Sequence, residues 1–264
     1  MVNIIFIYHH KTGHNLTRDL ANLIKTKNNK IKIIINKIKP RYFKEKNDEI
    51  ILNILEFDGD NNLFIQGSPF LEIKDNNIKI VHFIRNAYQM CISSYLYHRQ
   101  YPTPEKWVYT IDAEKHNKNI LNYMIKDLDV TENDINEVIK LIGKIYNKEK
   151  SYYDNLRDLD EEQGLILEAC RSIISNGAIA GGDILRMKFL NNKLKDKDII
   201  NINMEKMNNI STIESEIKKL MEYIYDGKKN NELIFYKNEI NFYNGLLFHM
   251  IKLIFLKQVF QLKL

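Results

Sequence analysis

The chain has few of the residues that build disulfide frameworks, metal sites or long linkers. Its 264 residues include 2 cysteines, 4 prolines, 10 glycines and 1 tryptophan. Two cysteines make neither a disulfide framework nor a zinc site, and Cys91 and Cys170 both lie in apolar contexts where buried free thiols are expected. The scarcity of proline and glycine argues against long disordered linkers.

Arginine and long apolar runs are also scarce. The net charge of +5 comes mostly from lysine, and only seven arginines occur, the last being Arg186, so a general nucleic-acid surface is not favoured. No apolar run is long enough for a transmembrane helix or a signal peptide. We therefore expect a cytoplasmic protein without a membrane span. The lysine-interrupted run Leu246–Leu264 favours packing on the sheet or on a second subunit over a membrane surface, so a homodimer remains an option.

The chain does have the composition of a globular domain, with 44% hydrophobic and 28% charged residues and enough length for a sizeable core. Short apolar runs predict strands at Val2–Tyr8, Ile31–Asn36, Asn62–Gln66, Ile78–Ile84 and Ile199–Asn203. A helix predicted from Asn15 separates the first two strands, and this order favours a parallel βαβ unit. The sequence therefore predicts an α/β fold with a central parallel sheet flanked by helices.

The second half of the chain is mainly helical by its three- and four-residue apolar spacing. Helices are predicted at 48–57, 88–99, 115–128, 131–147, 151–175, 208–225 and 239–260. We expect one domain over 1–264, in which 1–110 and about 198–207 form the α/β core. Residues 111–197 would then be a helical region, followed by C-terminal helices over 208–264.

The first candidate site is the loop Lys11-Thr12-Gly13-His14-Asn15, between the first strand and its helix. Backbone N–H groups and the positive end of the helix dipole face such a loop, and a lysine adds a full charge, so the loop suits an anion. Gly13 allows close approach of the backbone. A Walker A motif places glycine before lysine, whereas here the lysine precedes the glycine.

The second candidate site is the end of the strand Ile78–Ile84. Arg85 follows that strand directly, at the edge where ligands bind in open α/β sheets. Ser93 comes eight residues later, about two helical turns along the next helix. An arginine fork and a serine hydroxyl together could hold a phosphate.

These two patterns together resemble those of sulfotransferases that use 3′-phosphoadenosine-5′-phosphosulfate (PAPS). The family's 5′-phosphosulfate loop reads Lys-x-Gly-Thr-Thr/Ser, and its 3′-phosphate motif reads Arg-Asn/Asp-Pro with a serine eight residues after the arginine. Lys11, Gly13, Arg85, Asn86 and Ser93 match, while His14, Asn15 and Ala87 depart from the pattern. The resemblance extends over about residues 3–107, and more loosely to about 207, where Met204-Glu205 stands near the family's Glu-Asp-Leu turn. The family's C-terminal Arg-Lys-Gly element is missing, and only Lys228-Lys229 could replace it.

The resemblance implies a nucleotide-kinase-like sulfotransferase fold and transfer of a sulfuryl group from PAPS to a hydroxyl or amine of a small-molecule acceptor. The product would be 3′,5′-ADP, and no metal would be needed. Lys11 would stabilise charge on the departing phosphate. The loop from Thr12 to Asn15, above all its first three amides, would cradle the 5′-phosphate, and Arg85 with Ser93 would hold the 3′-phosphate.

The base that takes the acceptor's proton is less well marked. Glu168 is the first candidate, because it lies in an apolar helical stretch where burial would raise its pKa; a solvated or helix-pairing glutamate is the alternative. His10, His14 and His98 follow. His9, His10 and His14 lack a carboxylate cluster beside them, so a metal site is not favoured.

Two other classes of function remain open at this point. The altered loop and the missing C-terminal element would suit a binding protein that keeps an anion site on a degenerate sulfotransferase fold. An atypical P-loop nucleotide kinase is the other alternative.

Overall fold

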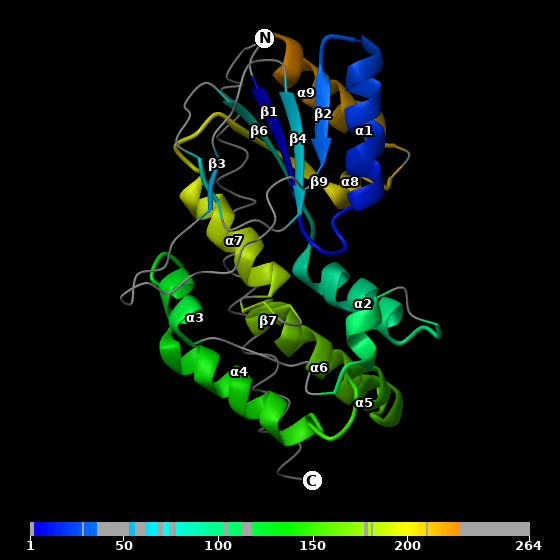
Figure 1. Ribbon diagram of the computed structural model, residues 1–264, viewed down its shortest axis with the longest axis vertical. Coiled ribbons are helices and arrows are strands. Elements are labelled where there is room, and N and C mark those ends of the chain that lie inside the picture. The colour runs from blue at the N-terminus through cyan, green and yellow to red at the C-terminus, as the bar shows by residue number, and fades with distance from the viewer. Residues whose placement is uncertain are drawn as a thin grey trace. The chain divides into compact units, whose positions relative to one another are not determined.

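The computed structural model describes residues 3–27, 29–35, 53–55, 62–67, 71–73, 78–102, 105–111, 118–176, 179–180, 182–209 and 211–226 (Figure 1). They form two compact units. Unit 1 takes in the described residues up to Asn86 and those from Leu190 onward. Unit 2 takes in the described residues from Ala87 to Phe189.

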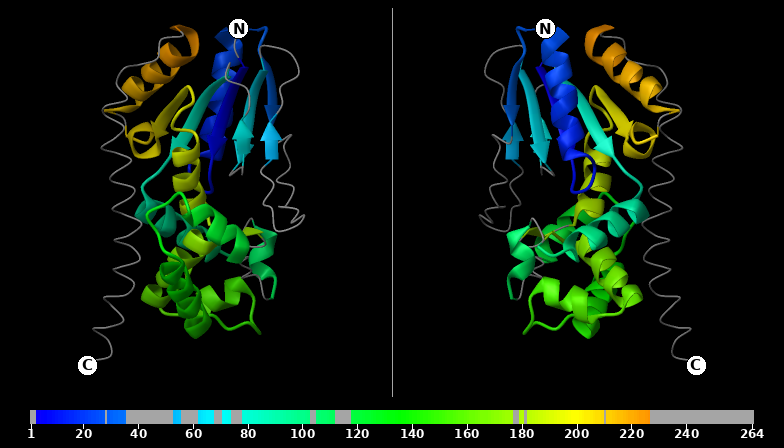
Figure 2. Two further views of the ribbon diagram at one scale, coloured as in Figure 1. Left: turned by 90° about the vertical axis from the view of Figure 1, so that its left-hand side faces the viewer. Right: turned by 90° about the vertical axis from the view of Figure 1, so that its right-hand side faces the viewer.

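A parallel sheet forms the centre of unit 1. Its strands lie in the order β2 (Lys32–Ile35), β4 (Asn62–Gly67), β1 (Asn3–Tyr8), β6 (Ile78–Ile84) and β9 (Ile199–Asn203), which can be followed by colour in the left view of Figure 2. Every pairing in this sheet is parallel. The predicted α/β fold with a central parallel sheet flanked by helices is therefore confirmed.

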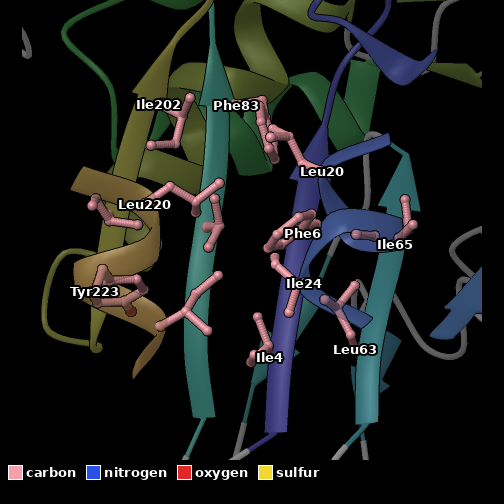
Figure 3. Close-up of a cluster of buried hydrophobic side chains, with 14 of the residues drawn as sticks. Ile4, Phe6, Leu20, Ile24, Leu63, Ile65, Phe83, Ile202, Leu220 and Tyr223 are labelled. Carbon is pink, nitrogen blue, oxygen red and sulfur yellow. The ribbon is translucent and has the colours of Figure 1, made fainter. Parts of the chain in front are cut away.

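The core of unit 1 lies between one face of this sheet and two helices, α1 (His14–Lys27) and α9 (Ile213–Asp226). Alternate strand residues face this core, since successive side chains of a strand point to opposite faces. Figure 3 shows Phe6 and Phe83 of the sheet with side chains of both helices, Leu20 and Ile24 of α1 and Leu220 and Tyr223 of α9. Burial of each such side chain stabilises the fold by about 1.5–3 kcal/mol.

Two polar side chains fasten α9 to the sheet. Lys79 of β6 is buried, and its Nζ donates to the carbonyl oxygens of Tyr223 and Ile224 at 2.5 and 2.9 Å. These carbonyls belong to the last turn of α9, where they lack intrahelical partners. The Tyr223 hydroxyl accepts from the amide of Ile80 and donates to the carbonyl oxygen of Asp198. The end of α9 is therefore tied to β6 and to the entry of β9.

Two further strands of unit 1, β3 (Asn53–Leu55) and β5 (Leu71–Ile73), pair in parallel. The helix predicted at 48–57 is wrong where it can be compared, because 53–55 form a strand. A short apolar run does not distinguish a buried helix from a strand by periodicity. After β9 the chain enters the short helix α8 (Met204–Met207), whose N-cap Asn203 accepts from the amide of Lys206.

Unit 2 is built mainly from helices and carries a two-stranded pair, β7 (Ser175–Asn176) and β8 (Ile179–Ala180). Its helices are α2 (Ala87–His98), η1 (Lys106–Tyr109), α3 (Lys118–Ile125), α4 (Glu132–Ile145), α5 (Tyr152–Asp158), α6 (Glu161–Ile174) and most of α7 (Asp183–Lys193). The predicted helical character of this region agrees with these elements. The prediction for 239–260 lies outside the described residues.

Two features of unit 2 differ from the predictions. The helix predicted over 151–175 is interrupted, since Leu159 is extended and the Asp160 carboxylate accepts from the amide of Gln163, which starts a new helix. Helix α7 was not predicted. Its residues from Asp183 to Leu190 are all buried, so it has no polar face and shows no amphipathic period.

Candidate functional site

The loop from His9 to Gly13, between β1 and α1, is braced by its own threonine. The amide and the hydroxyl of Thr12 both donate to the carbonyl oxygen of His9, at 3.1 and 2.9 Å. The His9 amide donates in return to Thr12 Oγ1 at 2.6 Å. The Thr12 amide, which was predicted to face an anion, is therefore used inside the loop, and the buried threonine acts as a brace.

Two residues of this loop have left-handed backbone conformations, Lys11 with φ 61° and Gly13 with φ 83°. Such a conformation costs a residue other than glycine about 1–3 kcal/mol and persists where the surroundings impose it, often at functional sites. A Cβ on Gly13 would also collide with the side chain of Met204 in α8. Glycine is thus favoured at position 13 mainly by conformation, since the flexible end of Met204 could move aside.

The first turn of α1 lies directly after the loop. The amides of a helix's first turn have no intrahelical partner and attract anions. His14 and Asn15 are exposed there, and the ring of His14 stacks on Tyr8 with centroids 4.8 Å apart. Partial burial, and then the charge of Arg18, lower the pKa of His14. His14 therefore presents a mainly neutral imidazole beside the loop at neutral pH.

Arg85 contacts the loop directly. Its Nη1 donates to the carbonyl oxygen of Lys11 at 2.8 Å, and its Nε lies 3.6 Å from Glu205 of α8. Glu205 also accepts a hydrogen bond from the amide of Asn86. Within the described part of the chain, Arg85 Nε is buried without a hydrogen-bond partner. The arginine is thus positioned by the loop and retains donor capacity.

The topology of the sheet explains why these residues meet. The chain runs from β1 to β2 and β4 on one side, and then crosses to β6 and β9 on the other side of β1. Ligands bind in open α/β sheets at the carboxyl ends of the strands where the order reverses. Lys11 and Gly13 follow β1, Arg85 follows β6, and Glu205 follows β9. These residues therefore lie at the edge where this rule places a ligand.

Ser93 lies on α2 in unit 2 and is half buried. Its pairing with Arg85 around one phosphate stays a prediction. Lys228 and Lys229, the possible substitutes for the missing C-terminal element, lie outside the described residues.

Glu168 of α6 lies at the centre of a buried polar cluster in unit 2. One carboxylate oxygen accepts from Nε and Nη2 of Arg171, at 3.1 and 2.6 Å. The other is 3.0 Å from Nδ1 of His98 and accepts from the Tyr152 hydroxyl at 2.9 Å. Arg171 also lies over the rings of Trp107 and Tyr152, with centroid distances of 5.0 and 5.5 Å.

The pKa predicted for Glu168 was wrong in direction. Burial raises it, as expected, but the positive charges of Arg171 and His98 and the hydrogen bonds from both outweigh burial and lower the pKa. Glu168 is fully buried and stays ionised at neutral pH. A carboxylate held by these three partners is suited to anchoring them, and its role as the base stays a prediction without support from its environment.

His98, another candidate base, is held between two carboxylates. Its Nε2 lies 3.2 Å from Glu105, which also accepts from the indole of Trp107. Burial lowers the pKa of His98, but Glu168 and Glu105 outweigh burial and raise it. The ring has no exposed surface. His10, in the turn after β1, is half buried in unit 1.

Sequence reasoning missed Glu205 as a neighbour of Arg85, and it missed His82. His82 lies in β6 within 2.8 Å of His9. A histidine in an apolar strand carries no local signal of its partner, since parallel pairing joins residues far apart in sequence.

Nothing among protein-family models, curated proteins or solved structures matches the chain. The helices within the described ranges are too short or too polar to cross a membrane. The functional argument therefore rests on the geometry of the chain's own residues.

Proposed function

We propose that the protein is a PAPS-dependent sulfotransferase acting on a hydroxyl or amine of a small-molecule acceptor. The observation that carries the proposal is the contact between Arg85 Nη1 and the Lys11 carbonyl oxygen. This contact joins two basic residues, each following a parallel strand, at one edge of the sheet. PAPS has a phosphosulfate at one end and a 3′-phosphate at the other, and two neighbouring basic loops suit such a ligand.

The proposed roles follow from charge and position. The ammonium of Lys11 would stabilise the negative charge that grows on the 5′-phosphate as the sulfuryl group leaves, an effect exerted mainly in the transition state. The amides of Gly13, His14 and Asn15 would hold the 5′-phosphate. Arg85 would hold the 3′-phosphate together with Ser93. Its buried Nε lies 3.6 Å from Glu205 but makes no hydrogen bond within the described residues, which supports a further acceptor at this point.

The reaction transfers the sulfuryl group to the acceptor oxygen or nitrogen, releases 3′,5′-ADP and removes one proton from the acceptor. Among the candidate bases, His14 is exposed, follows the Lys11 loop and has a lowered pKa. A neutral imidazole can accept that proton at physiological pH. The surroundings of Glu168 and His98 favour structural roles, so we place His14 first in the proposed mechanism.

The test is a comparison of ligands by calorimetry. 3′,5′-ADP should bind more tightly than ADP or ATP, without magnesium. Arg85→Ala should weaken 3′,5′-ADP binding by roughly 2–4 kcal/mol, the range for truncating one partner of a buried charge pair. Adenosine 5′-phosphosulfate lacks the 3′-phosphate, so Arg85→Ala should weaken its binding less. The remaining loss would reflect the missing hydrogen bond from Arg85 to the Lys11 carbonyl. Preference for ATP with magnesium would identify a nucleotide kinase instead.

Turnover separates an enzyme from a binding protein. Transfer of labelled sulfate from PAPS to a panel of phenols, alcohols and amines should fall by roughly 10²–10³ in kcat for Lys11→Ala, as for loss of one preorganised electrostatic donor. Tight 3′,5′-ADP binding with no transfer to any acceptor would favour the binding protein.

A further inference from the structure

The rings of two buried histidines are in contact next to the loop from His9 to Gly13, which is called the anion loop below. Nε2 of His9, the first residue after β1, lies 2.8 Å from Nε2 of His82 in β6. Neither residue has exposed surface. A hydrogen bond between two ring nitrogens needs one N–H donor and one unprotonated acceptor, so the contact requires that one of the two nitrogens carry no proton.

The surroundings of His82 decide which ring accepts. Its Nδ1 lies 2.9 Å from the side-chain oxygen of Asn191 in α7. A carbonyl oxygen can only accept, so His82 Nδ1 carries the proton and donates. In the neutral ring Nε2 then keeps its lone pair and accepts the N–H of His9 Nε2.

The groups that face His82 come from three elements: His9 from the loop after β1, Asn191 from α7 and Asn201 from β9. Only His9 among them can titrate. Burial lowers the pKa of His82 to about 4, and the bonds to the two asparagines offset part of that effect. The neutral ring is therefore the resting form near pH 7.

Main-chain hydrogen bonds of His9 couple its position to that of the loop. Its amide and carbonyl both bond to Thr12. Thr12 stands between Lys11 and Gly13, the two residues in left-handed conformations, and the Lys11 carbonyl accepts from Arg85. A displacement of the His9 ring would thus reach both basic residues of the proposed site.

We propose that His82 is a positioning residue for the anion loop: its neutral ring holds His9, and His9 holds the turn that carries Lys11 and Gly13. Protonation of His82 at Nε2 replaces the acceptor with a second donor facing His9, which breaks this contact and releases the loop. The proposal rests on the proposed function only for the choice of 3′,5′-ADP as a probe.

The first arm of the test needs no ligand. Heteronuclear NMR of the whole protein should show His82 as the Nδ1–H tautomer at pH 7. On acidification, the backbone amide signals of Thr12 and Gly13 should shift with the same midpoint as the His82 ring. In His82→Gln, whose amide oxygen can still accept from His9, those shifts should be absent. The proposal would be overturned if His82 had another tautomer at pH 7, or if the amide signals of Thr12 and Gly13 did not change as His82 titrates.

The second arm uses 3′,5′-ADP at pH 7. His82→Leu, which cannot accept from His9, should weaken binding at least tenfold, whereas His82→Gln should stay within threefold of the unmodified protein. Saturation with 3′,5′-ADP should also lower the pKa of His82, because linkage is reciprocal. Equal losses in both variants, or none in His82→Leu, would contradict positioning through His9. If the unmodified protein binds no 3′,5′-ADP, the proposed function fails, and the first arm still decides the role of His82.

Discussion

Glu168 shows how far a single residue can be interpreted from its neighbours in sequence. An acid among apolar helical residues is expected to be buried, and this one is. Burial alone would raise its pKa. Its positively charged partners, however, are Arg171 one turn away and His98 from α2, and the Tyr152 hydroxyl of α5 donates a further hydrogen bond. The sequence offered no means of pairing Glu168 with His98 or Tyr152. The charges of Arg171 and His98 reverse the direction in which burial shifts the pKa of Glu168.

Replacing Glu168 by glutamine should therefore act mainly by lowering the stability of unit 2, and only secondarily on turnover. Arg171 is 1% exposed, and removal of its counterion would leave a buried, uncompensated charge, at a cost of about 3–5 kcal/mol. Fluorescence of Trp107, which contacts Arg171, should report the loss in urea melts.

The matched control is Glu161→Gln, an exposed acid in the first turn of the same helix, which should cost less than about 1 kcal/mol. A double variant, Glu168→Gln with Arg171→Met, should recover part of the stability, since it removes both charges. A Glu168→Gln protein with normal stability and no turnover would instead return Glu168 to the role of base.

Glu205 would compete with the proposed ligand for Arg85. It lies 3.6 Å from Arg85 Nε and is 37% exposed, so its attraction is moderated by solvent. Glu205→Gln keeps an acceptor for the amide of Asn86 and removes the negative charge. We expect 3′,5′-ADP to bind about two- to fivefold more tightly, within the range of exposed pairs.

The gain from Glu205→Gln should shrink with added salt, because exposed charges are screened. Calorimetry at about 50 mM and about 500 mM salt would measure the gain in affinity and its dependence on salt. Weaker binding to Glu205→Gln would mean that Glu205 positions Arg85 for the ligand and does not compete with it.

At the scale of elements, the sequence predicted those elements that a local residue pattern determines. The loop Lys11–Asn15 and the junction at Arg85 were located because a strand, a turn and a helix start are all local signals. The five strands of the main sheet were also found, since buried parallel strands are short apolar runs. Helix α7 was missed because it is buried all round, and His82 was missed because its partners come from another strand and another helix.

The attachment of α9 to the sheet gives an element-scale prediction. Lys79→Met would keep the buried alkyl chain but leave the carbonyl oxygens of Tyr223 and Ile224 without their donor. An unsatisfied buried acceptor costs about 1–3 kcal/mol. Hydrogen exchange should show faster opening of α9, with the amides of β1 less affected.

Lys218→Met is the control within α9, because Lys218 is 74% exposed and its ion pair with Glu222 lies on the surface. It should change stability by less than about 0.5 kcal/mol. Equal effects of Lys79→Met and Lys218→Met would show that the bonds from Lys79 do not hold the helix end.

At the scale of the whole molecule, the two units contain buried histidines with opposite pKa shifts. In unit 1, burial lowers the pKa of His82 to about 4. Its contribution to stability is complete above the unfolded pKa of about 6.5 and is lost as pH falls toward the folded value. In unit 2, Glu168 and Glu105 overcome burial and raise the pKa of His98. That contribution is complete below the unfolded pKa and is lost as pH rises through the folded value.

We therefore expect the two units to respond to pH in opposite directions between about pH 5 and 8.5, a window bounded by the unfolded pKa values of carboxylates and of tyrosine or cysteine. Unit 1 should gain stability as pH rises, by about 2 kcal/mol over this window from the shift of His82. Unit 2 should lose stability above pH 6.5. The single tryptophan, Trp107, lies in unit 2, so its fluorescence follows that unit alone, while hydrogen exchange of the β1 and β6 amides follows unit 1.

The discriminating variant is His82→Gln, which removes from unit 1 the buried histidine whose pKa is lowered to about 4 and leaves the cluster around His98 untouched. It should flatten the pH dependence measured at the β1 and β6 amides and leave the fluorescence transition as it was. The midpoint of unit 1 relative to that of unit 2 should also rise steadily from pH 5 to pH 8.5. Coincident transitions at every pH, with the same slope from both probes, would mean that the units unfold as one cooperative body and that neither histidine acts locally.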